Sequence, residues 1–421
     1  MKPAPAPARG SYAEGFADVA ETFAAQLEDE VGASFAAYHH GERVVDLWGG
    51  KADRARAWER DTRIVVFSVT KGLTAMAFAL LTDRGQLDWD APVAQYWPGF
   101  AGGGKGAITV ATLLEHRAGL VGLDVPITLD ECIDGAPRVL AALEAQRPSW
   151  QPGTQQGYHA ITFGLFAREL FERIAGEDLG GFLRRELFTP LGADVDVGTP
   201  PVVDARIATL YPPSNASRVV RMLGAAIRGN TAEGRIARDV IKRGSLARAA
   251  FSTPSSGPLG LAVYNTQRVR RAQLAWANAT ASADGLARAY APFALGGAAF
   301  GKTYLSGSTL APIYLRQHWS ENDLVLHKPI GWSRGFVKEQ GELFSPNLES
   351  FGHPGMGGAL GWADPVAQLS FGYTMNKLDY RVRSPRTIAL CHALYRSVRS
   401  VGSVGSVGTQ GRATSSSESA G

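Results

Sequence analysis

A serine and a lysine stand three residues apart in F-S-V-T-K-G-L-T-A, at Ser68 and Lys71. If this stretch is helical, the two side chains share one face and can come within hydrogen-bond reach. A lysine in a partly desolvated pocket loses affinity for its proton and can act as a base toward a hydroxyl. The N-terminus of a helix also favours an oxyanion. The pair therefore has the chemistry of a nucleophile and its base.

The alternative interpretation is a helix cap beside a solvated lysine, which is the commoner meaning of an isolated S-x-x-K pattern. Ser68, however, is the only serine in the chain with a lysine three residues on. It also follows the apolar run 64–67, and a cap on an exposed helix needs no such apolar approach. These features favour a buried, reactive pair.

A serine hydrolase of this kind needs a second proton carrier and donors for the oxyanion. The segment 150–160, W-Q-P-G-T-Q-Q-G-Y-H-A, offers Tyr158. The segment 351–358, F-G-H-P-G-M-G-G, offers His353 among glycines that let a backbone N–H approach a substrate. Taken singly, Tyr158 is more simply a packed aromatic residue and His353 a loop histidine.

Together and in this order, the three segments resemble the serine β-lactamase and penicillin-binding-protein superfamily, and the pattern is nearest to class C β-lactamases and family VIII carboxylesterases. The resemblance runs from about Val31 to Leu394 and includes L-L-E-H-R-A-G-L at 113–120. It implies an α/β (α+β) fold of the β-lactamase/transpeptidase type. In that fold an antiparallel sheet built from both chain ends is flanked by helices and carries an inserted, mostly helical domain.

The resemblance also implies a role for each matching residue. Ser68 would be the acylated nucleophile, Lys71 would help to deprotonate it, and Tyr158 would carry the proton to the leaving group. His353-Pro354-Gly355 matches the family's Lys-Thr-Gly motif in a His-x-Gly form, which places His353 and Gly355 against the substrate. The backbone N–H groups of Ser68 and Met356 would form the oxyanion hole. Neither a metal nor an organic cofactor is implied.

Two departures from the family pattern bear on the substrate. Ala160 stands where the β-lactamase motif has an asparagine, and alanine cannot hydrogen-bond the acylamido group of a penicillin or peptide. His353 replaces a lysine, and a largely neutral histidine is a poorer anchor for a carboxylate. The sequence therefore predicts a carboxylesterase for small neutral esters with short to medium acyl groups.

Several alternatives remain open. A β-lactamase, a D-aminopeptidase or an acyltransferase would use the same acyl-serine, and a non-catalytic scaffold could retain the fold. An α/β-hydrolase would need a G-x-S-x-G elbow and a zinc hydrolase an H-E-x-x-H motif, and the sequence contains neither. Basic and apolar residues alternate over 218–250, which suggests a lid over the acyl pocket, a membrane-surface element or, more simply, an ordinary helix pair.

The pattern of apolar residues and turns predicts how these motifs are positioned. Two strands should span Gly32–Gly50 with a turn at His40-Gly41, and a helix should follow Ser68 and stop at Gly85. Further strands are expected within 330–338, 359–364 and 367–376, and a last helix over Pro385–Val398. We expect a flexible arm over 1–15, a sheet domain from 16–105 and 300–399, a helical domain over 106–299, and a disordered tail over 400–421.

Composition excludes other classes of function. The 421 residues carry a net charge of +4 spread over scattered arginines, which argues against nucleic-acid binding. There is no apolar run long enough to cross a bilayer and no secretory h-region near the N-terminus, so we expect a cytoplasmic protein without stable membrane insertion. Two cysteines form neither a disulfide framework nor a metal quartet. The sequence does not indicate an oligomeric state.

Overall fold

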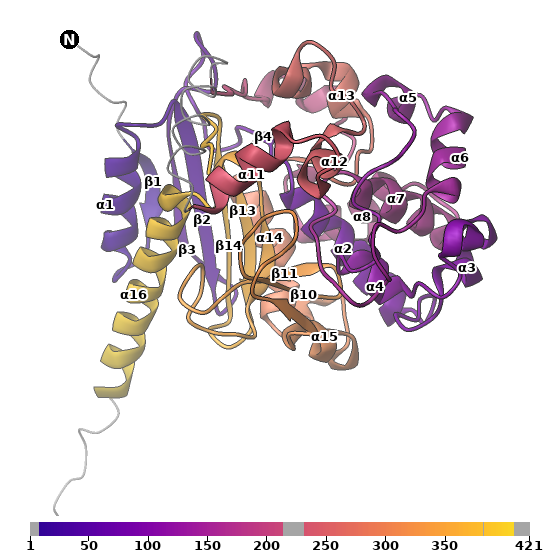
Figure 1. The fold of residues 1–421 in the computed structure, drawn as a ribbon. Helices are drawn as coiled ribbons and strands as arrows, with labels where there is room; N and C mark the ends of the chain where they lie inside the picture. The colour runs from indigo at the N-terminus through magenta and orange to yellow at the C-terminus, as the bar shows by residue number, and fades with distance from the viewer. Residues whose placement is uncertain (1–7, 214–230, 382, 408–421) are drawn as a thin grey trace, which may run out of the picture.

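A nine-stranded antiparallel sheet forms the centre of the protein (Figure 1). The computed structural model describes residues 8–213, 231–381 and 383–407. Across the sheet the strands are β1 (Arg9–Tyr12), β3 (Glu42–Gly50), β2 (Gly32–His39), β14 (Leu369–Met375), β13 (Leu360–Asp364), β12 (Phe351–Pro354), β11 (Phe336–Lys338), β10 (Ile330–Ser333) and β9 (His318–Ser320). Both ends of the chain therefore build one sheet, as predicted.

The two chain ends meet where β2 pairs with β14, from Ala33 opposite Met375 to His39 opposite Leu369. β2 continues into β3 through the two-residue turn His40-Gly41, whose φ angles are 51° and 81°. Positive φ at both central residues is what a type I′ hairpin turn requires, and glycine adopts it without strain. The predicted hairpin is confirmed.

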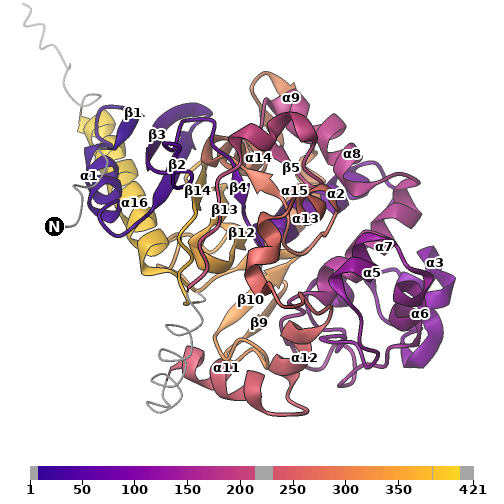
Figure 2. The same cartoon turned by 90° about the horizontal axis from the view of Figure 1, so that it is seen from above.

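Helices cover both faces of the sheet (Figure 2). On one face α14 (Ala283–Ala294) packs against β2, β13 and β14, and α2 (Val69–Asp83) packs beside it against β11 and β12. On the opposite face α1 (Ala17–Gln26) packs against α16 (Pro385–Val407). Every residue of α2 from Val69 to Leu81 is buried, because this helix lies between the sheet and the helical part of the molecule.

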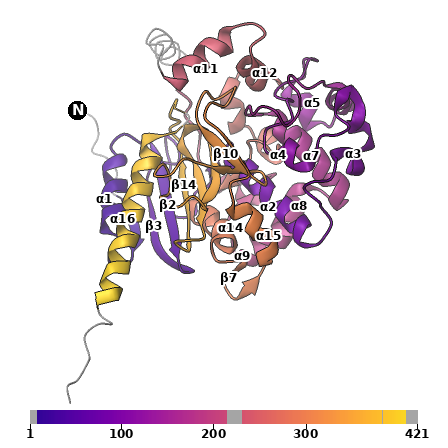
Figure 3. The same cartoon turned by 60° about the horizontal axis from the view of Figure 1, so that its bottom comes forward.

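The helices of residues 93–183 lie on the side of α2 away from the sheet (Figure 3). All the helices not yet named fall mostly between residues 93 and 271. They are α3 (Val93–Tyr96), α4 (Val110–Leu114), α5 (Leu129–Ile133), α6 (Pro137–Ala145), α7 (Thr162–Ala175), α8 (Leu179–Leu183), α9 (Thr189–Leu191), α11 (Ala232–Ile241), α12 (Leu246–Ser252), α13 (Gln267–Arg271) and, beyond them in the chain, α15 (Gly307–Tyr314). A three-stranded sheet pairs β4 (Ile64–Val65) with β6 (Thr280–Ala281) and β6 with β5 (Val195–Asp196), and β7 (Ala298–Ala299) pairs with β8 (Lys302–Thr303).

The structure corrects the expectations for the two chain ends. Within the predicted arm 1–15, Arg9–Tyr12 form strand β1, because they pair with the otherwise open edge of β3. Within the predicted tail, α16 continues to Val407, since extending an already formed helix costs little. Residues 1–7 and 408–421 lie outside the described residues.

Two other expectations concern the middle of the chain. α14 falls within 106–299 but packs on the sheet, so we propose that the sheet domain includes it. Of the segment 218–250, residues 218–230 lie outside the described residues, and the rest contributes α11 and most of α12, which pack on each other as a helix pair. The lid remains a hypothesis.

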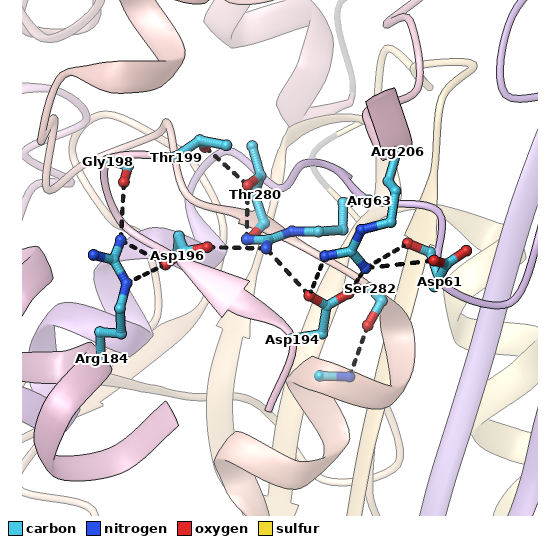
Figure 4. Close-up of polar contacts among 11 residues, drawn as sticks. Asp61, Arg63, Arg184, Asp194, Asp196, Gly198, Thr199, Arg206, Thr280 and Ser282 are labelled. Carbon is cyan, nitrogen blue, oxygen red and sulfur yellow. Dashed lines mark hydrogen bonds and ion pairs between the residues drawn. The ribbon is translucent and has the colours of Figure 1, made fainter. Parts of the chain in front are cut away.

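A buried ionic network fixes the small sheet just ahead of Ser68 (Figure 4). The guanidinium of Arg63 is 2% exposed and contacts the carboxylates of Asp194 and Asp196 at 3.2 and 2.9 Å. It also donates to the carbonyl of Thr280 at 2.7 Å. Arg63 thereby ties together the three strands of the small sheet, one of which leads directly into the serine.

We expect Arg63→Ala to lower the free energy of unfolding by about 3 kcal/mol, because the buried carbonyl of Thr280 loses its donor and each carboxylate keeps only its second arginine, Arg206 for Asp194 and Arg184 for Asp196. Arg60→Ala is the matched control: Arg60 is 49% exposed, and its partner Asp46 keeps Arg43 at 3.1 Å, so the loss of Arg60 should cost less than about 1 kcal/mol. Urea unfolding of both variants measures this difference, and equal losses would contradict the role given to Arg63.

Candidate active site

Ser68 lies at the start of α2, immediately after a strained residue. Phe67 has φ of 45°, a left-handed conformation that is costly for a side chain of this size, and its ring is buried against Tyr264 with centroids 5.2 Å apart. This conformation turns the chain from β4 into α2. The backbone N–H of Ser68 precedes the first helical turn and so has no acceptor within the helix.

The structure brings Ser68, Lys71 and Tyr158 into direct contact. Lys71 Nζ lies 3.1 Å from Ser68 Oγ, and Tyr158 Oη donates to the same oxygen at 2.9 Å. Lys71 Nζ also donates to the carbonyl oxygen of Trp276 at 3.0 Å. The serine hydroxyl is therefore placed between an amine and a phenol, the arrangement expected from the S-x-x-K spacing.

Burial sets the charge of these groups. Lys71 is 0% exposed, and desolvation holds its pKa well below the ordinary value of a lysine. Desolvation also raises the pKa of Tyr158, and the nearby carboxylate of Asp323 adds to the rise. A neutral amine has a lone pair that can accept the serine proton, and a neutral phenol still holds a proton to donate. Both pKa shifts therefore favour the forms that could exchange protons through Ser68.

His353 lies on β12 beside this group. Its Nδ1 is 2.8 Å from the carbonyl oxygen of Pro354, which can only accept, so Nδ1 carries the ring proton. Burial, with a further contribution from Lys71, lowers the pKa of His353 to about 3. The ring lies 6.2 Å from that of Tyr158, centroid to centroid. His353 is therefore a neutral residue at physiological pH.

Gly355 brings the two segments of the expected oxyanion hole together. A Cβ at this position would lie 2.3 Å from the carbonyl oxygen of Val66, so only glycine allows the approach. Val66 stands two residues before Ser68, and Met356 follows Gly355. The contact thus sets the spacing between the two backbone N–H groups. Ala160, 6% exposed, lies two residues beyond Tyr158 and presents a methyl group where the family has an amide.

Several groups that contact the site residues were not identified from the sequence. The carbonyl of Trp276 has no signature, because every residue has a carbonyl. Asp323 accepts from the backbone N–H of Tyr158 at 3.0 Å, and His116 Nδ1 accepts from that of His159 at 2.9 Å. His116 lies in the quoted motif L-L-E-H-R-A-G-L, which was the one available signal for it.

No metal site accompanies these residues in the described part of the chain, where no group of three or more His, Cys, Asp or Glu side chains could hold an ion. The two cysteines, Cys132 and Cys391, are both buried and unpaired with each other. Of the helices in residues 8–213, 231–381 and 383–407, none combines the length and hydropathy of a membrane-spanning segment.

Comparison with known proteins agrees with this geometry. Residues 19–392 match the family described as Beta-lactamase. The chain is 32% identical to the esterase/beta-lactamase LipL of Mycobacterium tuberculosis over 86% of its own length and 81% of that protein. It superposes on the crystal structure of a family VIII carboxylesterase with a TM-score of 0.80 and 35% identity, covering 93% of this chain and 99% of that one. It superposes on a penicillin-binding protein homolog from Caulobacter crescentus with a TM-score of 0.79 and 34% identity, covering 93% of this chain and 99% of that one.

Gly355→Ala tests the contact that spaces the oxyanion donors. The added methyl must push Met356 away from the Ser68 segment, and we expect kcat to fall by about 10²-fold, the effect of losing one such donor. Gly341→Ala is the control, because its Cβ would lie 3.7 Å from Leu348, an ordinary contact. Steady-state rates that are unchanged in both variants would refute this role of Gly355.

The pH dependence of kcat/KM tests the charge of Lys71. As the pH falls through the depressed pKa of Lys71, the amine takes up a proton and can no longer accept one from Ser68, so kcat/KM should fall toward acid. His353, with a pKa of about 3, should produce no step between pH 5 and 8. Accordingly the acid limb should keep its midpoint in His353→Asn, and a limb that disappears in this variant would assign it to the histidine instead.

Proposed function

The chain belongs to the Beta-lactamase family, and we propose that within this family of serine hydrolases it is a carboxylesterase that cleaves small esters with short to medium acyl groups. The observation that carries the proposal is Lys71, which is buried 3.1 Å from Ser68 Oγ with its pKa held well below the ordinary value by desolvation, with Tyr158 on the other side of the same oxygen. The similarity of the chain to an esterase/beta-lactamase and to a family VIII carboxylesterase supports the proposal.

In the proposed mechanism Ser68 Oγ attacks the ester carbonyl while its proton moves to Lys71 Nζ. The oxyanion is stabilised by the backbone N–H groups of Ser68 and Met356. Tyr158 donates its proton to the departing alcohol oxygen and is reprotonated from Lys71, which leaves an acyl ester on Ser68. Water then attacks this ester as the same groups carry protons in the opposite direction, and the acid leaves.

The walls of the site favour a neutral substrate. Ala160 offers no amide to an acylamido group, and His353 offers no fixed positive charge to a carboxylate, since burial keeps it neutral. Both features disfavour penicillins and peptides relative to simple esters. The chemistry of Ser68, Lys71 and Tyr158 does not depend on either position.

A second candidate is β-lactamase activity at the same serine. LipL is named as both an esterase and a beta-lactamase, and a penicillin-binding protein homolog shares the fold. A D-aminopeptidase or acyltransferase would use the same acyl-serine. A non-catalytic scaffold is disfavoured, because it would not need a fully buried lysine beside a serine.

Competing substrates test the proposal. We expect kcat/KM for p-nitrophenyl butyrate to exceed that for the cephalosporin nitrocefin by at least about 10²-fold, which is about 2.7 kcal/mol of transition-state discrimination. Ser68→Ala should abolish both activities. Comparable values for the two substrates would favour the β-lactamase instead.

Ala160→Asn tests the basis of this preference. A restored amide should raise nitrocefin hydrolysis relative to the ester by about 10-fold, the value of one hydrogen bond of about 1.4 kcal/mol. Ala160→Leu adds similar bulk without an amide and should not shift the ratio in this direction. A ratio that does not move in Ala160→Asn would remove Ala160 from the account of specificity.

A further inference from the structure

Asp323 is a buried carboxylate whose partners are mainly backbone N–H groups. It is 0% exposed, and its Oδ1 accepts from the N–H of Tyr158 at 3.0 Å and from those of Val325 and Leu326 at 2.9 Å each. The carboxylate thus joins two segments 165 residues apart in the chain. One of them carries Tyr158, and the other is the tight loop Asp323–Lys328, which we call the anchor loop.

The segment around Tyr158 has little regular structure of its own to hold it. Residues 155–159 belong to no helix or strand. Their backbone is held by contacts to His116: Gly157 N–H donates to the carbonyl of His116 at 3.1 Å, and His159 N–H donates to the ring Nδ1 of His116 at 2.9 Å. Between these two bonds lies the N–H of Tyr158, and Asp323 is its acceptor.

The anchor loop is itself clamped from its other side by α11. Lys328 Nζ contacts Glu233 Oε1 at 2.7 Å, Arg235 donates to the carbonyl of His327 at 2.9 Å, and His327 Nε2 lies 2.8 Å from Asp239 Oδ2. Within the loop, Asp323 N–H donates to the carbonyl of Lys328 at 3.0 Å. The carboxylate of Asp323 is therefore presented by a segment that is fixed at both faces.

We propose that Asp323 is a positioning residue for Tyr158: by holding the Tyr158 backbone, it keeps the phenol oxygen 2.9 Å from Ser68 Oγ. Asp323 acts on turnover through Tyr158 and does not touch the reacting atoms. A reacting group displaced by about 1 Å can cost about 10²-fold in rate, which sets the expected size of the effect. This inference rests on the role given to Tyr158 in the proposed function.

A purely structural Asp323 would lower stability without acting through Tyr158, and a double-mutant cycle separates the two cases. We expect Asp323→Ala to lower kcat for p-nitrophenyl butyrate by about 10²-fold with KM changed less than about 3-fold. In a Tyr158→Phe background the same change should add less than about 3-fold, because no phenol is left to position. Asp323→Asn keeps an acceptor oxygen in place and should stay within about 10-fold of wild type.

Asp364 supplies a matched control. It is also a carboxylate of 0% exposure, and it accepts from the hydroxyl of Tyr395 at 2.6 Å and from the backbone N–H groups of Val366 and Ala367 at 3.0 Å each. It stands at the end of β13 remote from the pairing of Gly361 with His353. Asp364→Ala should lower the melting temperature as Asp323→Ala does, yet leave kcat within about 2-fold of wild type.

The rate of Ser68 labelling by a fluorophosphonate provides a second readout that needs no ester substrate. The proposal is supported if Asp323→Ala slows labelling and Asp364→Ala does not. In the Tyr158→Phe background, Asp323→Ala should cause no further slowing. Equal kcat values in Asp323→Ala and Asp364→Ala, or losses that multiply with Tyr158→Phe, overturn it. If Tyr158→Phe alone retains wild-type rates, the assigned role of Tyr158 fails and this inference falls with it. Loss in Tyr158→Phe but not in Asp323→Ala overturns this inference alone.

Discussion

The site depends on one constraint, the burial of an amine whose hydrogen-bond partners are neutral oxygens. Lys71 Nζ contacts Ser68 Oγ and the carbonyl of Trp276, and neither brings a negative charge that would hold a proton on the amine. Burial disfavours an ammonium in such surroundings, which lowers the pKa of Lys71 and favours the base that the proposed mechanism needs. A lysine at the surface three residues after a serine would keep its ordinary pKa and would not be a base at neutral pH.

Much of the fold excludes water from the Lys71 amine and holds its partners in position. α2 is buried all round between the sheet and the helical part, so its first turn is shielded from water. The approach to Ser68 is fixed by the Arg63 network, and the close approach of Gly355 to Val66 sets the distance between the two segments proposed to hold the oxyanion. Tyr158 comes from a loop that is held by Asp323 and His116. Segments far apart in the sequence thus converge on one hydroxyl.

The sequence predicted the features that rest on short-range pattern. The helix after Ser68, the His40-Gly41 hairpin and strands β10, β11, β13 and β14 follow from periodicity and turn residues, and the S-x-x-K spacing identified the pair that the structure places in contact. Strand β12, which carries His353, was not predicted, because its glycine-rich segment is typical of a loop. The sequence could not show Asp323, the carbonyl of Trp276 or the Arg63 network, because these act through tertiary contacts that leave no local signature. The edge strand β1 was missed for the same reason: its pairing partner, not its own residues, makes it a strand.

The most direct test of the central claim, that Ser68 is acylated by simple esters, is the intact mass of the protein after brief exposure to p-nitrophenyl butyrate or, separately, to a cephalosporin. We predict ester turnover with a transient butyryl adduct on Ser68, no lasting cephalosporin adduct, and neither turnover nor adduct in Ser68→Ala. An adduct that still forms in Ser68→Ala would contradict the assignment of Ser68 as the nucleophile. A cephaloyl adduct on Ser68 without ester turnover would contradict the carboxylesterase and give the β-lactamase first place.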